Sequence, residues 1–282
     1  LFNTREKLWL VDRNGKDVAH FPVELRSPAT NGVNVFDYAN NRNYRYFVAG
    51  EDQRVYAYDA TGKIVQGWEF EKTAHPVSSP VEHYRIGRKD YIVFQDKSKV
   101  YIQNRRGQTR VETASWFENS QNPLAIDLNG RPKIVVTDTE GNVHYIYFNG
   151  EHVQKKTGGF SSEHYFTVAD LNGDEVPDFI FVDGKEVTVI TEEGKRLFRE
   201  RTEHELSFPP NIYTFGPDLK KVGVTDAAAN RIYLFNPDGS QHEGFPLQGN
   251  TEFTIGKLNE DTAGLNLLVG SQGGRLYNYT LE

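Results

Sequence analysis

Cysteine is absent from this 282-residue chain, which excludes disulfide bonds, thiolate zinc sites and cysteine nucleophiles together. Apolar runs of the ~20 residues that a membrane span requires are also missing. Basic residues are in the minority, with 32 Lys and Arg against 39 Asp and Glu and a formal net charge of −7. A nucleic-acid-binding protein usually shows a broad basic surface. We therefore expect neither a nucleic-acid partner nor direct insertion into a membrane.

Glycines in polar turns recur along the whole chain. Each is followed by a charged or polar residue, and successive glycines are 47, 45, 43, 44 and 45 residues apart. They are Gly15, Gly62, Gly107, Gly150, Gly194 and Gly239. Such a period indicates an internal structural repeat.

Short strands rich in β-branched and aromatic residues surround each of these turns. The strands expected directly before the turns are 8–11, 55–58, 100–102, 143–146, 187–190 and 232–235, with a seventh at 276–279. Their hairpin partners are expected at 46–49, 91–94, 134–136, 179–182, 222–224 and 267–269. Two further strands complete each unit, for example 195–199 after a turn and 165–169 before a hairpin. No segment shows a sustained 3.6-residue period, so we expect almost no helix.

Four short antiparallel strands every ~44 residues are the signature of a β-propeller blade. One blade cannot bury both of its faces, so neighbouring blades must stack. We expect Trp9, Tyr56, Tyr101 and Tyr233, which share one strand position, to fill the layers between blades. The hairpins predict an all-β fold of seven blades. Six remain possible if the terminal hairpins combine, and eight if the natural chain carries another blade upstream.

The ends of the sequence indicate a single propeller domain, 1–282, that is a fragment of a longer chain. The first repeat lacks an innermost strand and the last lacks an outermost strand. We therefore expect segments 1–21 and 267–280 to be β-structure and to lie side by side, closing the ring.

One acidic loop between two expected strands carries metal-binding chemistry. Its oxygen-bearing side chains are those of Asp170, Asn172, Asp174 and Asp178, and the carbonyl of Val176 can add a further ligand. A loosely shaped ring of oxygen ligands suits Ca²⁺ better than Mg²⁺. The sequence therefore predicts one structural calcium ion; the alternative is an acidic turn exposed to solvent.

Three other loops match the spacing of this acidic loop but lack its set of acidic residues. Segment 127–133 places Arg131 and Lys133 where acids are needed, and segments 37–43 and 257–262 match more loosely. We expect no calcium in these three loops.

The acidic loop and a second segment resemble known repeat families. Residues 168–182 (VADLNGDEVPDFIFV) resemble the FG-GAP or VCBS repeat of integrin α-chain propellers, which implies that the same five positions bind calcium. This chain departs at Glu175, where the family usually has glycine. Residues 55–68 resemble one bead of the pyrroloquinoline-quinone-type propeller, matching at Ala57, Asp59, Thr61, Gly62 and Trp68.

The segments SPATNG, KDYIVFQDK and NRRGQ are similar to propeller-containing envelope proteins of Bacteroides-type bacteria. That similarity implies a location in the bacterial periplasm or at the cell surface.

Catalytic signals are weak throughout. The chain has no G-x-S-x-G, P-loop or H-E-x-x-H motif, and its four Glu-His pairs place adjacent side chains on opposite faces of a strand. These pairs are Glu82-His83, Glu151-His152, Glu163-His164 and Glu203-His204. We expect a monomeric, non-catalytic module that binds a protein or a glycan. The alternative is an enzyme with a site in the propeller channel, either glycan-active or quinoprotein-like.

Overall fold

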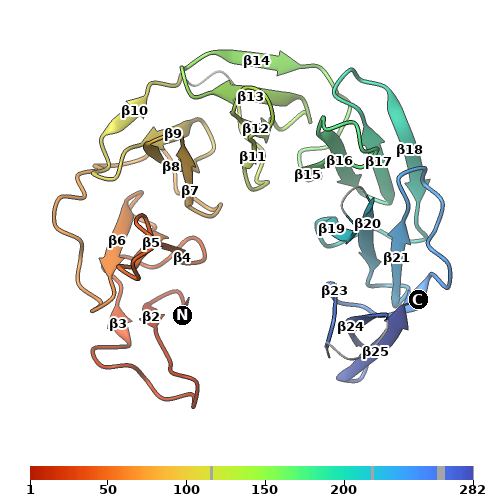
Figure 1. Ribbon diagram of the computed structural model, residues 1–282, viewed down its shortest axis with the longest axis horizontal. Coiled ribbons are helices and arrows are strands. Elements are labelled where there is room, and N and C mark those ends of the chain that lie inside the picture. Colours follow the sequence, from red (N-terminus) through yellow and green to blue (C-terminus); the bar gives the residue numbers. More distant parts are fainter. Residues whose placement is uncertain (115–116, 217–218, 259–263, 282) are drawn as a thin grey trace. The chain divides into compact units, whose positions relative to one another are not determined.

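The computed structural model describes residues 1–114, 117–216, 219–258 and 264–281. Within these ranges the fold is all-β: the described residues form seven antiparallel sheets and no helix (Figure 1). By packing, the chain divides into two compact units, residues 1–139 with 143–154 and residues 140–142 with 155–282.

The first unit carries four of these sheets, each a simple meander in chain order. The first contains β1 (Phe2–Asn3), β2 (Lys7–Trp9) and β3 (Val23–Glu24), and the second contains β4 (Asn34–Phe36), β5 (Arg45–Ala49) and β6 (Val55–Asp59). The third contains β7 (Glu82–Ile86), β8 (Lys89–Gln95), β9 (Val100–Gln103) and β10 (Thr109–Val111). The fourth contains β11 (Ala125–Asp127), β12 (Lys133–Thr137), β13 (Val143–Tyr147) and β14 (His152–Lys155).

The second unit carries the other three sheets, again meanders. The fifth contains β15 (Tyr165–Ala169), β16 (Asp178–Asp183), β17 (Glu186–Ile190) and β18 (Arg196–Arg201). The sixth contains β19 (Asn211–Gly216), β20 (Leu219–Asp226), β21 (Arg231–Phe235) and β22 (Leu247–Gln248). The seventh contains β23 (Phe253–Gly256), β24 (Leu265–Ser271) and β25 (Arg275–Leu281).

The six glycine turns have one common geometry. Each glycine takes a left-handed φ between 75° and 89°, and its N–H donates to the carbonyl three residues earlier. A turn followed by a left-handed residue is a favoured hairpin connection, and glycine takes that conformation without steric cost. The periodic turns predicted from the sequence are confirmed.

Buried side chains fill the layers between successive sheets. In the first unit, Ile92 and Phe94 of β8 pack with Phe47 of β5. In the second unit, Val189 of β17 packs with Val222 of β20. All five are exposed by 1% or less. Stacked sheets therefore bury each other's apolar faces, as the repeat requires.

The expected strands are present, with two differences. The second sheet has three strands rather than four, because the segment after Gly62 pairs with β6 only through a bridge between Tyr58 and Ile64. Trp9 stacks on the half-exposed Phe2, with ring centroids 6.1 Å apart, and is not part of the described core clusters. Tyr101 and Tyr233 lie in inter-sheet clusters as expected, and Tyr56 packs at the margin of one.

The terminal sheets have the predicted strand content. The first and the last of the described sheets each have three strands. Segments 1–21 and 267–280 both contain β-strands, in agreement with the sequence. Their proximity stays a prediction.

Candidate functional site

The predicted calcium loop joins β15 to β16 in the fifth sheet. Ala169 and Asp178 are cross-strand partners, so residues 170–177 form the connection between the two strands. The carboxylate of Asp170 accepts hydrogen bonds from the backbone N–H groups of Gly173, at 2.8 Å, and Glu175, at 3.0 Å. The structure thus gathers the acidic side chains around a tight, self-capped loop.

Asn172 and Asp174 lie on the exposed side of this loop. The Asn172 amide donates to Asp174 Oδ2 at 2.9 Å, and the N–H of Val176 donates to Asp174 Oδ1 at 2.9 Å. Glu175 takes a left-handed φ of 66°, a conformation that non-glycine residues seldom adopt. The position where the family usually has glycine therefore needs glycine-like geometry here as well, and Glu175 adopts it.

Asp178 differs from the other acids of the loop because it is buried, with 1% of its surface exposed. Its Oδ2 accepts the N–H of Leu171 at 2.9 Å. Burial raises the pKa of Asp178 to about 6, the hydrogen bonds from Leu171 and Asn172 oppose that rise, and the charges of Asp174 and Asp170 add to it. The three carboxylates are therefore close enough to repel one another.

The donor chemistry of this loop fits a hard cation. Three carboxylates, an amide oxygen and a backbone carbonyl are the ligand types that calcium takes. Among the described residues, however, no group of three or more His, Asp or Glu has the arrangement of a ready metal site. The Asp170 carboxylate caps its own loop, so binding a cation requires it to exchange backbone N–H donors for the ion.

In two of the three loops that match this pattern, the acidic side chains already have partners within the protein. In segment 127–133 the buried Lys133 ammonium lies 2.5 Å from Asp127 Oδ2, so a side-chain cation stands where a metal would be needed. In segment 37–43 Asp37 accepts the N–H groups of Asn41 and Arg42. Residues 259–262 of the third loop lie outside the described residues.

In segment 55–68, which resembles a pyrroloquinoline-quinone-type repeat, the matching residues have structural roles. Asp59 caps its turn by accepting from Thr61 and Lys63. The Trp68 indole donates to the Val55 carbonyl at 2.7 Å and meets the Phe47 ring edge-on at 4.9 Å. The matching positions of this segment thus form a turn and attach Trp68 to the second sheet.

Three histidines contact acidic side chains that are not their neighbours in the sequence. His83 lies 2.9 Å from Asp90, and His204 lies 3.4 Å from Asp226. In the fourth sheet the buried His144 contacts Asp138 Oδ2 at 3.0 Å and His152 at 2.8 Å. Burial lowers the pKa of His144, although Asp138 opposes this effect.

Hairpin patterns could have indicated two of these groups. The two-residue turn after β7 places Arg85 opposite Asp90, and His83 lies diagonally on the same face. Diagonal neighbours across a strand pair are within reach of long side chains. The β12–β13 hairpin gives a similar signal for Asp138 and His144, because His144 is opposite Val136 and Asp138 lies two residues further along.

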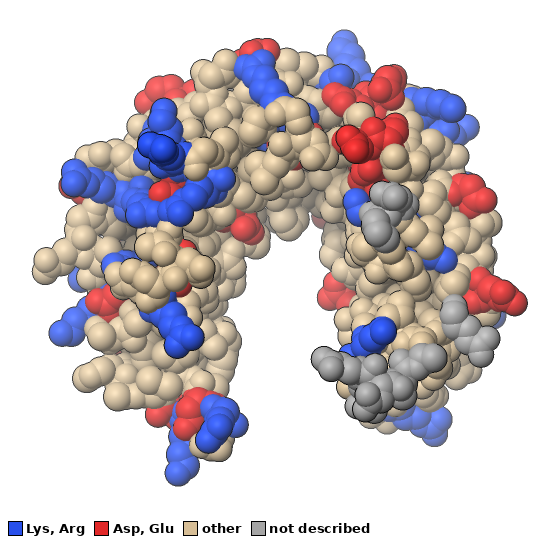
Figure 2. All heavy atoms as spheres, viewed as in Figure 1, with Lys and Arg blue, Asp and Glu red and all other residues tan. Residues whose placement is uncertain are grey.

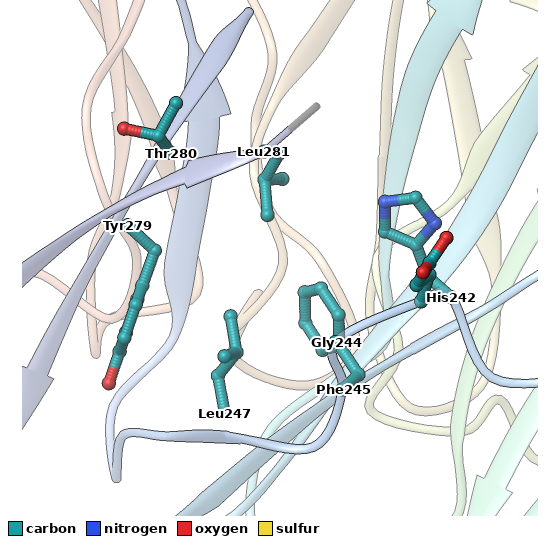
Figure 3. A pocket seen from close by; sticks show the side chains of 8 residues that line it. His242, Gly244, Phe245, Leu247, Tyr279, Thr280 and Leu281 are labelled. Atoms are coloured by element: carbon teal, nitrogen blue, oxygen red, sulfur yellow. The ribbon is translucent and has the colours of Figure 1, made fainter.

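A pocket of about 290 Å³ lies in the second unit between the loop before β22 and the end of β25 (Figure 3). Phe245, Leu247, Tyr279 and Leu281 line it with apolar groups, and His242, Glu243 and Thr280 add polar ones. The Tyr279 hydroxyl donates to the Gln248 carbonyl at 3.1 Å, which fixes the ring. Sequence reasoning did not nominate these residues.

No family model matches the chain, and no curated protein matches it. Among solved structures, a computationally designed protein, Ika8, is similar at 13% identity, with 95% of this chain and 75% of that chain covered and a TM-score of 0.62. The BBS1N chain crystallised in complex with ARL6DN is similar at 12% identity over 99% and 84% of the two chains, with a TM-score of 0.56. BamB from Moraxella catarrhalis shows 14% identity over 93% and 85%, with a TM-score of 0.49.

These likenesses concern the fold alone, because identity is low. Together with the sheet layout, the two likenesses with TM-scores above 0.5 show a chain built from β-propeller-type sheets. In the described part of the chain, no helix is long and apolar enough to cross a membrane.

Proposed function

We propose that this chain is a non-catalytic β-propeller module that binds a protein or glycan partner as part of a scaffold. One observation carries the proposal: the most distinctive residues of the repeat form turns and packing contacts. Asp59 caps a turn, and the Trp68 indole bonds to the Val55 carbonyl. The propeller-like BBS1N, which shares the fold, was crystallised in complex with ARL6DN. Propellers host many functions, so the fold supports this role by analogy.

Seven blades in one closed ring is the architecture that we propose. The seven sheets of the described residues support that count. Six or eight blades in the natural protein remain the alternatives that the repeat allows.

We also propose that the 170–178 loop binds one structural calcium ion through Asp170, Asn172, Asp174, Asp178 and the Val176 carbonyl. Its oxygen donors and the raised pKa of the buried Asp178 carboxyl support this. A bound divalent cation offsets the repulsion between the three carboxylates and so stabilises the connection between β15 and β16. We further propose that the protein is monomeric and lies in the bacterial periplasm or at the cell surface.

Glycan-array and affinity-capture experiments test the binding role. We expect a specific partner for the parent chain, and weaker retention by a Tyr279→Ala variant if the partner uses the pocket beside Tyr279 in the second unit. The matched control is Tyr277→Ala, two residues earlier on the same strand. Robust hydrolase or dye-linked dehydrogenase turnover by the purified chain would contradict the non-catalytic assignment.

A further inference from the structure

Positive charge is concentrated in one part of an otherwise acidic chain. Residues 85–110 carry eight Lys and Arg against two Asp, a net charge of +6. Because the whole chain carries −7, the remainder carries −13. Figure 2 shows Lys and Arg side chains gathered over the third sheet.

Five of these eight residues, together with Arg42 and Arg45, lie at one end of the second and third sheets. The β4–β5, β7–β8 and β9–β10 connections all lie at this end, because each sheet is an antiparallel meander. We call this group the basic end; its residues are Arg42, Arg45, Arg85, Arg88, Lys89, Arg105 and Arg106.

Contacts to one backbone carbonyl join the two sheets at the basic end. The Tyr38 carbonyl accepts hydrogen bonds from Arg85 and from Arg105, the latter at 3.0 Å. The Arg105 guanidinium also lies 4.6 Å from the centre of the Tyr38 ring. These contacts hold the cations in fixed positions, which reduces the ordering cost of binding an anion.

The acids at this end already have partners. Asp90 lies 3.0 Å from Arg85, 2.8 Å from Arg105 and 2.9 Å from His83. Burial acts to raise the pKa of Asp90, but the hydrogen bonds from these three side chains outweigh it and lower the pKa. Asp37 caps its own loop, and Glu69 accepts from Gln108. Asp59, which is paired with Arg45 across the strands, accepts from Thr61 and Lys63.

Four cations of the basic end remain open to a partner. Arg42, Arg88, Lys89 and Arg106 are exposed, and among the residues that the structure describes their side chains make no ion pair. The end therefore presents more positive charge than its own acids neutralise.

A pocket of about 250 Å³ lies within the basic end, beside Arg45 and Arg105, with Tyr38, Asn41, Asn43 and Val65 among its lining residues. Its volume is below the ~300–1,000 Å³ of sites for whole small molecules, and suits one or two side chains. Arg105, together with Arg85, already holds the Asp90 carboxylate within the fold itself.

We propose that the basic end binds an acidic segment of a protein partner, with an Asp or Glu carboxylate seated in the pocket beside Arg45 and Arg105. This inference rests on the proposed function, a binding module, and names its class of partner. Charge complementarity supports a short acidic peptide: the patch is confined to the ends of two sheets, whereas the net negative charge of the remainder repels a long polyanion.

The test uses the full chain and a fluorescein-labelled peptide of alternating Glu and Ser, followed by fluorescence anisotropy. A peptide with Gln in place of Glu and a single-stranded DNA of equal charge serve as comparison probes. We expect the Glu peptide to bind, the Gln peptide not to bind, and affinity to fall with added salt.

Charge-reversal variants locate the binding. Arg88→Glu/Arg106→Glu should weaken binding by about tenfold or more, because both cations face the ligand. The control Lys97→Glu/Lys99→Glu changes the net charge equally at the opposite end of the same sheet, and should change affinity by less than about twofold. Arg45→Gln tests the pocket itself and should also weaken binding. Melting curves check that each variant is folded.

Three results would overturn the inference: no binding of the Glu peptide, equal loss in both double variants, or tighter binding of the DNA. A natural partner that binds the parent and Arg88→Glu/Arg106→Glu equally would also overturn it, while leaving the proposed function intact. Catalytic turnover would instead contradict the proposed function.

Discussion

At the residue scale, Asp178 combines deep burial with two nearby acids on the same loop. Its carboxyl accepts backbone hydrogen bonds from Leu171 and Asn172, but it lies within the field of Asp170 and Asp174. A buried carboxylate without a counter-ion is costly, so the protonated form is favoured. This single residue therefore links the stability of the fifth sheet to pH and to any bound cation.

We expect Asp178 to make the protein less stable as pH rises in the absence of calcium. An acid whose folded-state pKa is raised stabilises the fold fully below its ordinary pKa, and that contribution is lost as pH rises through about 6. The loss is on the order of 3 kcal/mol. Urea unfolding in EDTA between about pH 4 and pH 7 measures it, as the difference between the parent and Asp178→Asn. The same slope in both proteins would contradict the assignment.

Calcium should stabilise the parent through the same loop. Binding to the folded state alone adds about 2.7 kcal/mol at a hundredfold excess over Kd. Melting curves in EDTA and in millimolar CaCl₂ should show this shift for the parent and for the control Asp238→Ala, an exposed turn acid in another sheet. The shift should vanish in Asp174→Ala. An unchanged parent, or an equal shift in Asp174→Ala, refutes the calcium site.

At the element scale, the glycine turns connect the third and fourth strands of a repeat and differ in what surrounds them. A Cβ on Gly107 would lie 2.5 Å from the backbone nitrogen of Phe70, whereas one on Gly194 would meet nothing within 4 Å. Both glycines have a left-handed φ. The turn at Gly107 is therefore also part of the packing between the second and third sheets.

Alanine substitution separates these two roles of glycine. Gly194→Ala should destabilise the protein by about 1–2 kcal/mol, the cost of a left-handed conformation. Gly107→Ala should cost more, because backbone at Phe70 must also move. Chemical denaturation of the two variants measures the difference. If both variants lose the same free energy of unfolding, the backbone near Phe70 can move aside without an energetic penalty, and the prediction is wrong.

At the scale of the whole molecule, the predicted ring closure concerns the two ends of the chain. Segments 1–21 and 267–280 are expected side by side if seven blades close one ring. Because the chain has no cysteine, Thr4→Cys/Thr280→Cys gives a clean pair of labelling sites, and both positions are exposed. Spin-label distance measurements should give a short, narrow distribution for this pair, with Thr4→Cys/Glu112→Cys as a longer comparison. A long distance for the terminal pair would contradict closure.

Local physical chemistry makes much of this protein predictable from its sequence. The alternation of apolar residues and the left-handed glycines define hairpins within a few residues, so the strands and the six turns follow from the order of residues alone. The acidic loop is visible for the same reason, since Asp170 to Asp178 lie within one connection. The weakened fourth strand after Gly62 was not foreseen, because it depends on pairing rather than on local pattern.

Tertiary structure alone decided which distant charges meet. Arg85, Asp90 and Arg105 belong to one sheet, but Arg105 reaches the Tyr38 carbonyl only because the second and third sheets pack together. In the same way, burial determines the raised pKa of Asp178, and the pocket at Tyr279 requires β25 to lie against the loop before β22. Strand formation depends on neighbours along the chain, whereas the partners of a side chain depend on how the sheets stack.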